Sequence, residues 1–230
     1  MRVSVIIPVF NEIKTLRLVV EKIIAVDIAK EIIIVDDAST DGTHELIENE
    51  LKEKVDKVVY HPFNRGKGAA LQTGFKQATG DVVIIQDADM EYNPNEYTLL
   101  LQPILDGKAD VVYGSRFVGH GPRRVLFFWH AVANKIITTL SNMFTNLNLT
   151  DVETGFKVLR KDILDKIKLE ENRFGFEIEI TIKLARLKCR IYEIGISYWG
   201  RDYSEGKKIT WKDGIRAIFC ILKYGILKKN

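Results

Sequence analysis

The sequence predicts an α/β fold in which a mixed, mostly parallel sheet is flanked by helices, with amphipathic helices at the C-terminus. Short runs rich in Val and Ile alternate with longer segments that have helical periodicity. The runs VSVIIPV, EIIIV and DVVII are apolar almost throughout, which is typical of parallel strands buried on both faces. With 230 residues, of which 46% are hydrophobic, the chain can build one sizeable core. We therefore expect a single domain over residues 1–230.

The alternation is regular over the first half of the chain. Strands are predicted over residues 3–9, 31–36, 57–60, 81–86 and 109–114. Helices are predicted between them, over residues 13–26, 42–54, 68–79 and 94–107. The last of these helices has Pro94 at its start and Gly107 just past its end, which is the usual polarity of these residue types. This order favours parallel strands joined by helical crossovers.

A different pattern begins after residue 115. Residues 115–124 form a loop rich in Gly, Pro and Arg, and a long aromatic and apolar helix is predicted over residues 125–146. The remaining predicted elements are a strand over 155–159, a helix over 177–188, a strand over 190–197 and a helix over 210–230. No internal repeat or linker divides the chain, so the second half is expected to extend the same domain.

Cysteine usage and hydropathy indicate a cytoplasmic protein. The two cysteines, Cys189 and Cys220, cannot form a disulfide framework, and no Cys/His cluster has the spacing of a zinc site. Asn11 and Glu12 follow the first apolar run at once, which is not the pattern of a signal peptide. No stretch reaches the roughly 20 apolar residues that a membrane-spanning helix needs.

Charge is distributed unevenly along the chain. The net charge is +3, but residues 1–150 carry 16 basic and 19 acidic residues, whereas residues 151–230 carry 18 and 12. A basic C-terminal third is expected to meet an anionic partner, which is a phosphorylated substrate, a lipid headgroup or a nucleic acid. A solvated basic face without a partner is the alternative.

Polar residues follow most of the predicted strands. Ligands of open parallel α/β sheets bind at the carboxyl ends of the strands. The residues expected at these ends are Asn11, Glu12, Asp36, Asp37, Asp87, Asp89, Glu91 and Arg116. Carboxylates crowded at one edge repel one another, so a cation or several hydrogen-bond donors must offset them.

Asp87, Asp89 and Glu91 form the candidate metal site. On an extended chain, alternate side chains point to the same face, so the three carboxylates are expected to lie together. Hard oxygen ligands of this kind suit Mg²⁺ or Mn²⁺, which take further ligands from substrate phosphates. An Asp-x-Asp pair also occurs in ordinary turns and on solvated faces, but its place after a buried strand favours a metal site.

Residues 64–70, NRGKGAA, are the candidate diphosphate loop. The glycines allow the backbone to approach a ligand, and Arg65, Lys67 and the following helix N-terminus supply positive potential. An ordinary junction between a loop and a helix is the alternative. The sequence has no P-loop motif and no G-x-G-x-x-G after the first strand, which argues against P-loop NTPases and dinucleotide oxidoreductases.

Together these segments resemble glycosyltransferase family 2 enzymes, which have the Rossmann-like GT-A fold. The resemblance is carried by VSVIIPVFNE, IIIVDDASTDGT, NRGKGAALQTGF, GDVVIIQDAD and YGSR, in this order. The later segments DVETGFKVLRKDIL, NRFGFEIEIT and EGKKITWKDG are similar to those of polyprenol-phosphate sugar synthases, the dolichol-phosphate mannose synthase group. The resemblance implies that residues 1–115 bind a nucleotide sugar and that residues 116–230 bind the acceptor.

The resemblance also implies roles for individual residues. Those implied to bind the nucleotide sugar are Pro8, Phe10, Asn11, Glu12, Asp37, Lys67, Gln72 and Asp87. Those implied to bind the metal are Asp87, Asp89 and Glu91, the last standing where the group often has Gln. Those implied to bind the acceptor phosphate are Arg116, Arg124, Arg201 and Lys207. The expected catalytic residues are Asp89, Arg116, Asp151 and Arg201.

The reaction implied by the resemblance is the inverting transfer of a hexose from a UDP- or GDP-sugar to polyprenyl or dolichyl phosphate. A metal ion and nearby cations stabilise the departing diphosphate. A phosphomonoester is already ionised near neutral pH and attacks without a strong base. The alternative acceptor, a sugar or protein hydroxyl, needs Asp151 or Glu153 as base. With a phosphate acceptor, these two residues position it or cap the neighbouring structure.

Two segments predict contact with a membrane surface. Residues 123–144 and 215–229 combine aromatic and apolar side chains with Arg and Lys, which suits helices that lie in the bilayer interface. Residues 195–230 hold 8 basic and 3 acidic residues. We expect a peripheral protein at the cytoplasmic face, bound through this surface or through a membrane-protein partner. Packing of both helices on the sheet as ordinary core is the alternative.

Two other classes of protein are less consistent with the sequence. A non-catalytic nucleotide-binding or scaffold protein would not need a divalent cation beside a diphosphate, so Asp87, Asp89 and Arg116 argue against it. Nucleic-acid binding is not expected, because the basic C-terminal third contains no recognised reader motif.

Overall fold

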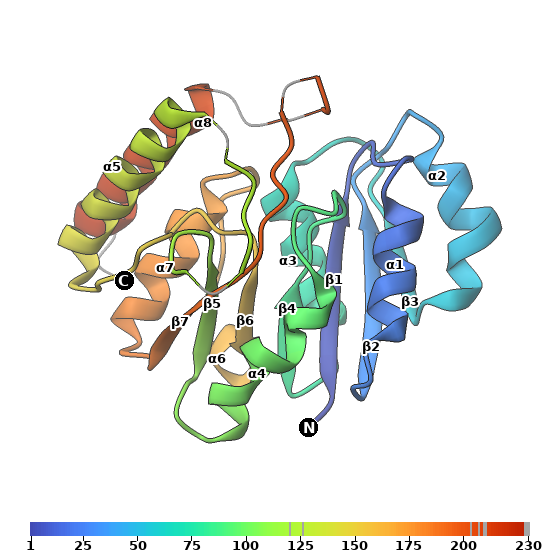
Figure 1. Cartoon of the computed structure of the whole chain (residues 1–230), viewed down its shortest axis with the longest axis horizontal. Coiled ribbons are helices and arrows are strands. Elements are labelled where there is room, and N and C mark those ends of the chain that lie inside the picture. Colours follow the sequence, from blue (N-terminus) through green and yellow to red (C-terminus); the bar gives the residue numbers. More distant parts are fainter. Residues whose placement is uncertain (120, 126, 203, 207, 209–210, 228–230) are drawn as a thin grey trace.

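Seven strands form one mixed sheet within the described residues, which are 1–119, 121–125, 127–202, 204–206, 208 and 211–227. In this computed structural model the strand order is β3-β2-β1-β4-β6-β5-β7, and helices cover both faces (Figure 1). The strands are β1 (Val3–Val9), β2 (Lys30–Asp36), β3 (Lys57–Tyr60), β4 (Val82–Ile85), β5 (Val111–Ser115), β6 (Lys157–Arg160) and β7 (Ile191–Gly195). The predicted fold class is confirmed.

Strand β6 is antiparallel to its neighbours β4 and β5, whereas the other pairs are parallel. The carboxyl ends of the six parallel strands therefore meet at one edge of the sheet, and the amino end of β6 lies at the same edge. The segment before β6 is thus brought beside the segments that follow β1, β4, β5 and β7.

The core has two layers, one on each face of the sheet. Along β1, Val3, Val5, Ile7 and Val9 pack toward one face and Ile6 toward the other, because successive side chains of a strand alternate. Helices α1 (Leu16–Ala25) and α4 (Tyr97–Leu105) cover the first face. Helices α3 (Lys67–Gln77) and α7 (Phe176–Arg186) cover the second. Strands buried on both faces explain the continuous apolar runs of the sequence.

Shorter helical segments complete the first half of the fold. The predicted helix 42–54 is helical from Thr43 onward but changes type, from α2 (Thr43–Leu46) to a π-helical turn η1 (Ile47–Leu51) and a 3-10 turn η2 (Lys52–Lys54). A second 3-10 turn, η3 (Pro94–Glu96), leads into α4, and α6 (Lys161–Leu164) follows β6. Pro94 lies at the start of its turn as the sequence predicts.

Two amphipathic helices, α5 (Phe128–Thr145) and α8 (Trp211–Leu222), lie side by side at one end of the molecule (Figure 1). Each buries only a few side chains, such as Ile137 in α5 and Ile221 in α8, and leaves large apolar ones exposed. A π-helical turn, η4 (Lys223–Leu227), extends α8. Among the described helices, none is long and apolar enough to cross a bilayer.

A buried carboxylate anchors α8 and η4 to the rest of the domain. Glu171 is 4% exposed, and it accepts hydrogen bonds from Arg216 at 2.7 Å, Lys223 at 2.8 Å and Tyr224 at 2.9 Å. Burial alone would raise the pKa of Glu171, but these donors outweigh it and lower the pKa to about 2. The ionised carboxylate therefore stabilises the docked helix.

Acid is expected to release this anchor. Because the pKa of Glu171 is lower in the folded chain than in the unfolded chain, its contribution to stability is present above about pH 4.5 and is lost as the pH falls toward 2. Glu171→Gln should lower the free energy of unfolding at pH 7 by about 1–3 kcal/mol. Urea denaturation against pH should show this difference shrinking below pH 4. A difference that does not change with pH would contradict the ionic anchor.

Close packing of α3 on β1 gives a second stability test. A Cβ at Gly74 would lie 2.3 Å from Cγ2 of Ile6, so Gly74→Ala should lower the free energy of unfolding by about 1–3 kcal/mol. At Gly214, in α8, an added Cβ meets nothing within 4 Å. Gly214→Ala should therefore be neutral or stabilising by up to about 1 kcal/mol. Equal urea midpoints for the two variants would contradict this packing.

Candidate active site

One cavity of about 1370 Å³ lies at the edge of the sheet where the parallel strands end. Its two ends differ in chemistry. The charged end is lined by residues that include Glu12, Asp37, Lys67, Asp87, Asp89, Glu91, Arg116, Glu153 and Arg201. The apolar end lies between α5 and α8 and is lined by residues that include Phe128, Trp129, Ile136, Ile137, Ile215 and Ile218. A molecule with an anionic head and an apolar chain matches this distribution.

The three acidic residues after β4 line the cavity, but not on an extended strand as the sequence predicts. Strand β4 ends at Ile85, and the chain turns through residues 88–91 with a positive φ of 64° at Met90. The backbone N–H of Glu91 donates to Oδ1 of Asp89 at 3.2 Å. The expected alternation along a strand is therefore wrong, and the turn instead gathers the carboxylates at the cavity wall.

Two cations reach these carboxylates from other elements. Lys67, at the start of α3, lies 2.7 Å from Oδ1 of Asp87. Arg201, in the chain between β7 and α8, donates to Oδ2 of Asp89 at 2.9 Å and to both oxygens of Glu12 at 3.0 and 3.1 Å. These ion pairs join the ends of β1 and β4 to α3 and to the segment after β7.

The acidic charge is only partly balanced. Burial, followed by repulsion from Glu91 and Asp87, raises the pKa of Asp89 to about 7, although Arg201 acts in the opposite direction. A divalent cation would offset this repulsion, and carboxylate oxygens are the donors that Mg²⁺ and Mn²⁺ prefer. No group of three or more acidic, His or Cys side chains is preformed for a metal among the described residues. Asp87 and Asp89 therefore fit a cation that takes its other ligands from a substrate.

Glu91 has protein partners on both of its carboxylate oxygens. The backbone N–H of Arg201 donates to Oε1 at 2.7 Å, and the Tyr198 hydroxyl donates to Oε2 at 2.7 Å. Glu91 thus ties the segment after β7 to the turn after β4. Its role as a direct metal ligand stays a prediction.

Asp37 holds the loop that leads into α3. Its carboxylate accepts from the backbone N–H of Arg65 at 2.9 Å and of Gly66 at 2.6 Å, and it lies 2.6 Å from Nδ1 of the buried His61. At Gly66 φ is +97°, and a Cβ would lie 2.5 Å from the carbonyl oxygen of Asn172, so only glycine fits. His61 lies three residues before the start of the candidate diphosphate loop and was not among the predicted site residues.

The structure brings most of the predicted nucleotide-sugar residues to the cavity. Those in its lining are Pro8, Phe10, Glu12, Asp37, Lys67 and Asp87. Two others lie outside it. The Asn11 side chain accepts from the backbone N–H of Thr40 at 2.7 Å, and Gln72 donates to the carbonyl of Glu171 at 3.1 Å.

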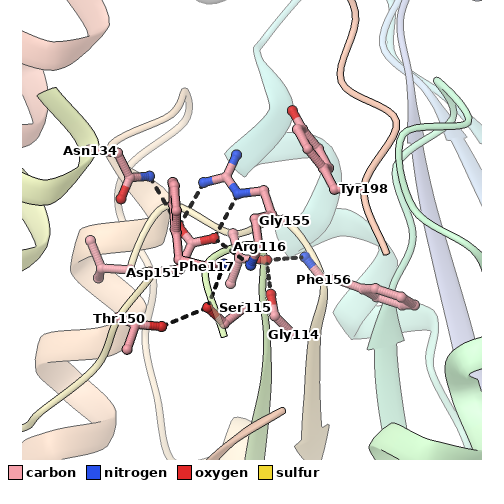
Figure 2. Close-up of polar contacts among 12 residues, drawn as sticks. Gly114, Ser115, Arg116, Phe117, Asn134, Thr150, Asp151, Gly155, Phe156 and Tyr198 are labelled. Carbon is pink, nitrogen blue, oxygen red and sulfur yellow. Dashed lines mark hydrogen bonds and ion pairs between the residues drawn. The ribbon is translucent and has the colours of Figure 1, made fainter. Parts of the chain in front are cut away.

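Arg116 and Asp151 form a buried ion pair beside the cavity (Figure 2). Arg116 donates from Nε to Oδ2 of Asp151 at 2.6 Å and from Nη2 to Oδ1 at 2.7 Å, and Asn134 adds a hydrogen bond at 3.0 Å. Burial would raise the pKa of Asp151, but the charge and hydrogen bonds of Arg116 lower it. Asp151 is therefore an ionised anchor that orients Arg116, and it is poorly suited to accept a proton from a substrate.

The remaining predicted acceptor residues lie in or near the segment after β7. Arg124 lines the cavity and donates to the carbonyl of Gly200 at 3.2 Å. Lys207 lies outside the described residues. Its neighbour Lys208, which the sequence analysis did not select, donates to Oε1 of Glu12 at 2.7 Å. In the sequence, Lys208 lies in the segment EGKKITWKDG, which carries part of the family resemblance, but its neighbour Lys207 was predicted instead.

The sheet order, with acidic residues at the strand ends and Arg201 and Lys208 paired with them, is that of a protein with the GT-A fold. The family model "Glycosyl transferase family 2" matches residues 4–168, and the chain belongs to this family. The predicted family and the predicted enzyme class, a glycosyltransferase, are confirmed.

Relatives cover nearly the whole chain. It is 33% identical to the undecaprenyl-phosphate mannosyltransferase of Micrococcus luteus, over 98% of this chain and 95% of that protein. It is 30% identical to the dolichol-phosphate mannosyltransferase of Pyrococcus furiosus, over 97% of this chain and 64% of that protein. Glucosyl-3-phosphoglycerate synthase of Mycobacterium tuberculosis, crystallised with Mn²⁺, UDP and phosphoglyceric acid, has the same fold. Its TM-score is 0.76 at 21% identity, over 99% of this chain and 80% of that one.

Proposed function

We propose that the protein transfers a hexose from a nucleotide sugar to a polyprenyl phosphate, with inversion and with Mg²⁺ or Mn²⁺. The observation that carries this proposal is the cavity, which has carboxylates and cations at one end and apolar side chains of α5 and α8 at the other. A nucleotide diphosphate and the phosphate of a lipid acceptor fit the charged end, and a polyprenyl chain fits the apolar end. The names of the mannosyltransferase relatives support this acceptor class and favour mannose as the hexose.

The charged end supplies the binding chemistry of the donor. A divalent cation, when held by Asp87 and Asp89, would stabilise the negative charge of the departing diphosphate. Lys67 lies at the N-terminus of α3, where a helix favours anionic ligands, and its ammonium group is already directed at Asp87. Arg201 spans Glu12 and Asp89 and places a second cation on the same side. These fixed charges act on the leaving group without solvent reorganisation.

Arg116 is suited to hold the acceptor phosphate, because Asp151, itself held by a hydrogen bond from Asn134, fixes the Arg116 guanidinium group at the cavity. An ionised phosphate attacks without a base, so transfer to a phosphate does not require the buried Asp151, which is paired with Arg116, to accept a proton. A hydroxyl acceptor is the alternative, and it would depend on Glu153, since Asp151 is paired with Arg116. The apolar end of the cavity favours the lipid phosphate.

The same helices support a peripheral location at the cytoplasmic face of a membrane. Phe128, Trp129, Trp211 and Phe219 are exposed on α5 and α8. Basic side chains flank them, and Arg216 lies over the ring of Phe219 at 4.9 Å. Aromatic and basic side chains on one surface suit an interface that contains anionic lipids. A polyprenyl chain would then enter the cavity from the bilayer.

Asp89→Asn tests the donor and metal assignment. Loss of one carboxylate charge should reduce sugar transfer by about 100-fold or more, because the cation and the diphosphate lose their shared anchor. The measurement is transfer from UDP- and GDP-sugars to polyprenyl phosphate with Mn²⁺, followed by mass spectrometry of the extracted lipid. Asp106→Asn, at the exposed end of α4, is the matched control. Undiminished transfer by Asp89→Asn would overturn the metal assignment.

Ile218→Asp tests the apolar end. Ile218 lines the cavity, and a polyprenyl chain bound there would cover the charged Asp side chain, which is unfavourable. The KM for a long polyprenyl phosphate should therefore rise by about 10-fold or more. The KM for a short, water-soluble prenyl phosphate should change little. Ile24→Asp, on α1, is the control, since Ile24 is 44% exposed and Ile218 is 40% exposed. An equal effect on both acceptors would contradict the proposed path of the chain.

A further inference from the structure

The loop over residues 151–155, which leads into β6, connects the two parts of the site that the proposed function assigns to the donor diphosphate and to the acceptor phosphate. At its start, Asp151 holds Arg116, the proposed acceptor-phosphate residue (Figure 2). At its end, a Cβ on Gly155 would lie 2.3 Å from Oδ2 of Asp87 and 3.0 Å from Nζ of Lys67. The loop is therefore in contact with the donor side and with the acceptor side. It is fixed in place by Thr154, whose hydroxyl donates to the carbonyl of Gly114 at 2.5 Å.

Glu153 lies in the middle of this loop and lines the cavity. A sugar that moves from a diphosphate to an acceptor phosphate must lie between the two anions. The position of Glu153 along the loop, between Asp151 and Gly155, places it beside that space.

One oxygen of Glu153 has no partner in the described part of the chain. Its Oε1 atom is buried and accepts no hydrogen bond. A buried polar atom without a partner costs about 1–3 kcal/mol, and such atoms are few in native proteins. In an enzyme site, a substrate group that hydrogen-bonds to this atom would recover that cost.

The surroundings of Glu153 allow it to act as donor or acceptor. Burial and the negative charges of Glu177 and Asp151 raise its pKa to about 7, while Lys157 and Arg116 oppose the increase. Glu177 is itself engaged, by Lys157 and, at 3.6 Å, by Lys67. A carboxyl group that carries a proton for part of the time can pair with a hydroxyl group in either direction.

We propose that Glu153 hydrogen-bonds a hydroxyl group of the transferred hexose and so helps to select the sugar. This inference rests on the proposed function and adds a specificity-determining residue to it. The role differs from that of a base for a hydroxyl acceptor, because a base must take up a proton, whereas recognition needs only a hydrogen-bonding group. A Gln side chain can still hydrogen-bond a hydroxyl group, but it cannot take up a proton as a base.

The experiment compares the wild-type enzyme with Glu153→Gln and Glu153→Leu on the best nucleotide hexose and on its monodeoxy analogues. Wild type should discriminate against one deoxy sugar by about 100-fold or more in kcat/KM, because a site built for a hydroxyl is left unpaired without it. Glu153→Leu should lose about 10-fold to 100-fold on the parent hexose and should lose most of that discrimination. Glu153→Gln should keep both values within about 10-fold of wild type.

Binding of the nucleoside diphosphate alone separates the sugar contact from general damage to the site. Its affinity should be the same in all three proteins, and Glu50→Gln, in η1 and outside the cavity lining, should match wild type throughout. If the urea midpoint shows that Glu153→Leu does not fold, Glu153→Ser replaces it, because the short Ser side chain is also unable to reach the sugar.

Two results would overturn the inference while leaving the proposed function intact. One is unchanged discrimination among deoxy sugars in Glu153→Leu. The other is loss of transfer in Glu153→Gln to the level of Glu153→Leu, which would identify a base. Failure of the wild type to transfer sugar from any nucleotide donor to polyprenyl phosphate is a different outcome, and it would overturn the proposed function and this inference together.

Discussion

Repulsion among carboxylates at one edge of the sheet is the constraint that organises this domain. Glu12, Asp89 and Glu91 come from the ends of two neighbouring strands, and burial makes their charge costly. Arg201 reduces that cost from more than one hundred residues away, by pairing with Glu12 and Asp89 and by donating its backbone N–H to Glu91. The segment after β7 is therefore held over the strand ends by the charges that would bind a substrate, and Figure 1 shows it rising above that edge.

The antiparallel strand β6 brings a further segment of the chain to the cavity edge of the sheet. An all-parallel arrangement would send the chain before β6 to the opposite edge of the sheet. Reversal of β6 brings Asp151, Glu153 and Gly155 to the acidic edge, where they lie between Arg116 and Asp87. Helices α5 and α8 then extend the cavity with apolar side chains. The proposed binding of a charged donor and of a lipid acceptor would thus depend on the same strand reversal.

The sequence was sufficient to predict the fold class, because parallel strands buried on both faces appear as continuous apolar runs. These runs can be recognised without knowing which residues are in contact in the fold. It also located the acidic strand ends. It did not predict the turn that gathers Asp87 and Asp89, since the positive φ of Met90 has no signal in the residue type. The pairing of Lys208 with Glu12 joins residues 196 positions apart, and local patterns do not report such contacts. Asn11 and Gln72 were selected by resemblance, yet their side chains are bonded to neighbouring backbone outside the cavity.

Binding of Mn²⁺ measured by electron paramagnetic resonance, with and without nucleoside diphosphate, is the decisive measurement for a cation held by Asp87 and Asp89. Asp87 and Asp89 would supply too few ligands for tight binding alone, so we expect weak Mn²⁺ binding to the free protein and binding at least about 10-fold tighter when UDP or GDP is present. By linkage, the nucleotide should bind more tightly by the same factor when Mn²⁺ is present. Nucleotide affinity that is independent of Mn²⁺ would show that no cation is shared between these carboxylates and the diphosphate.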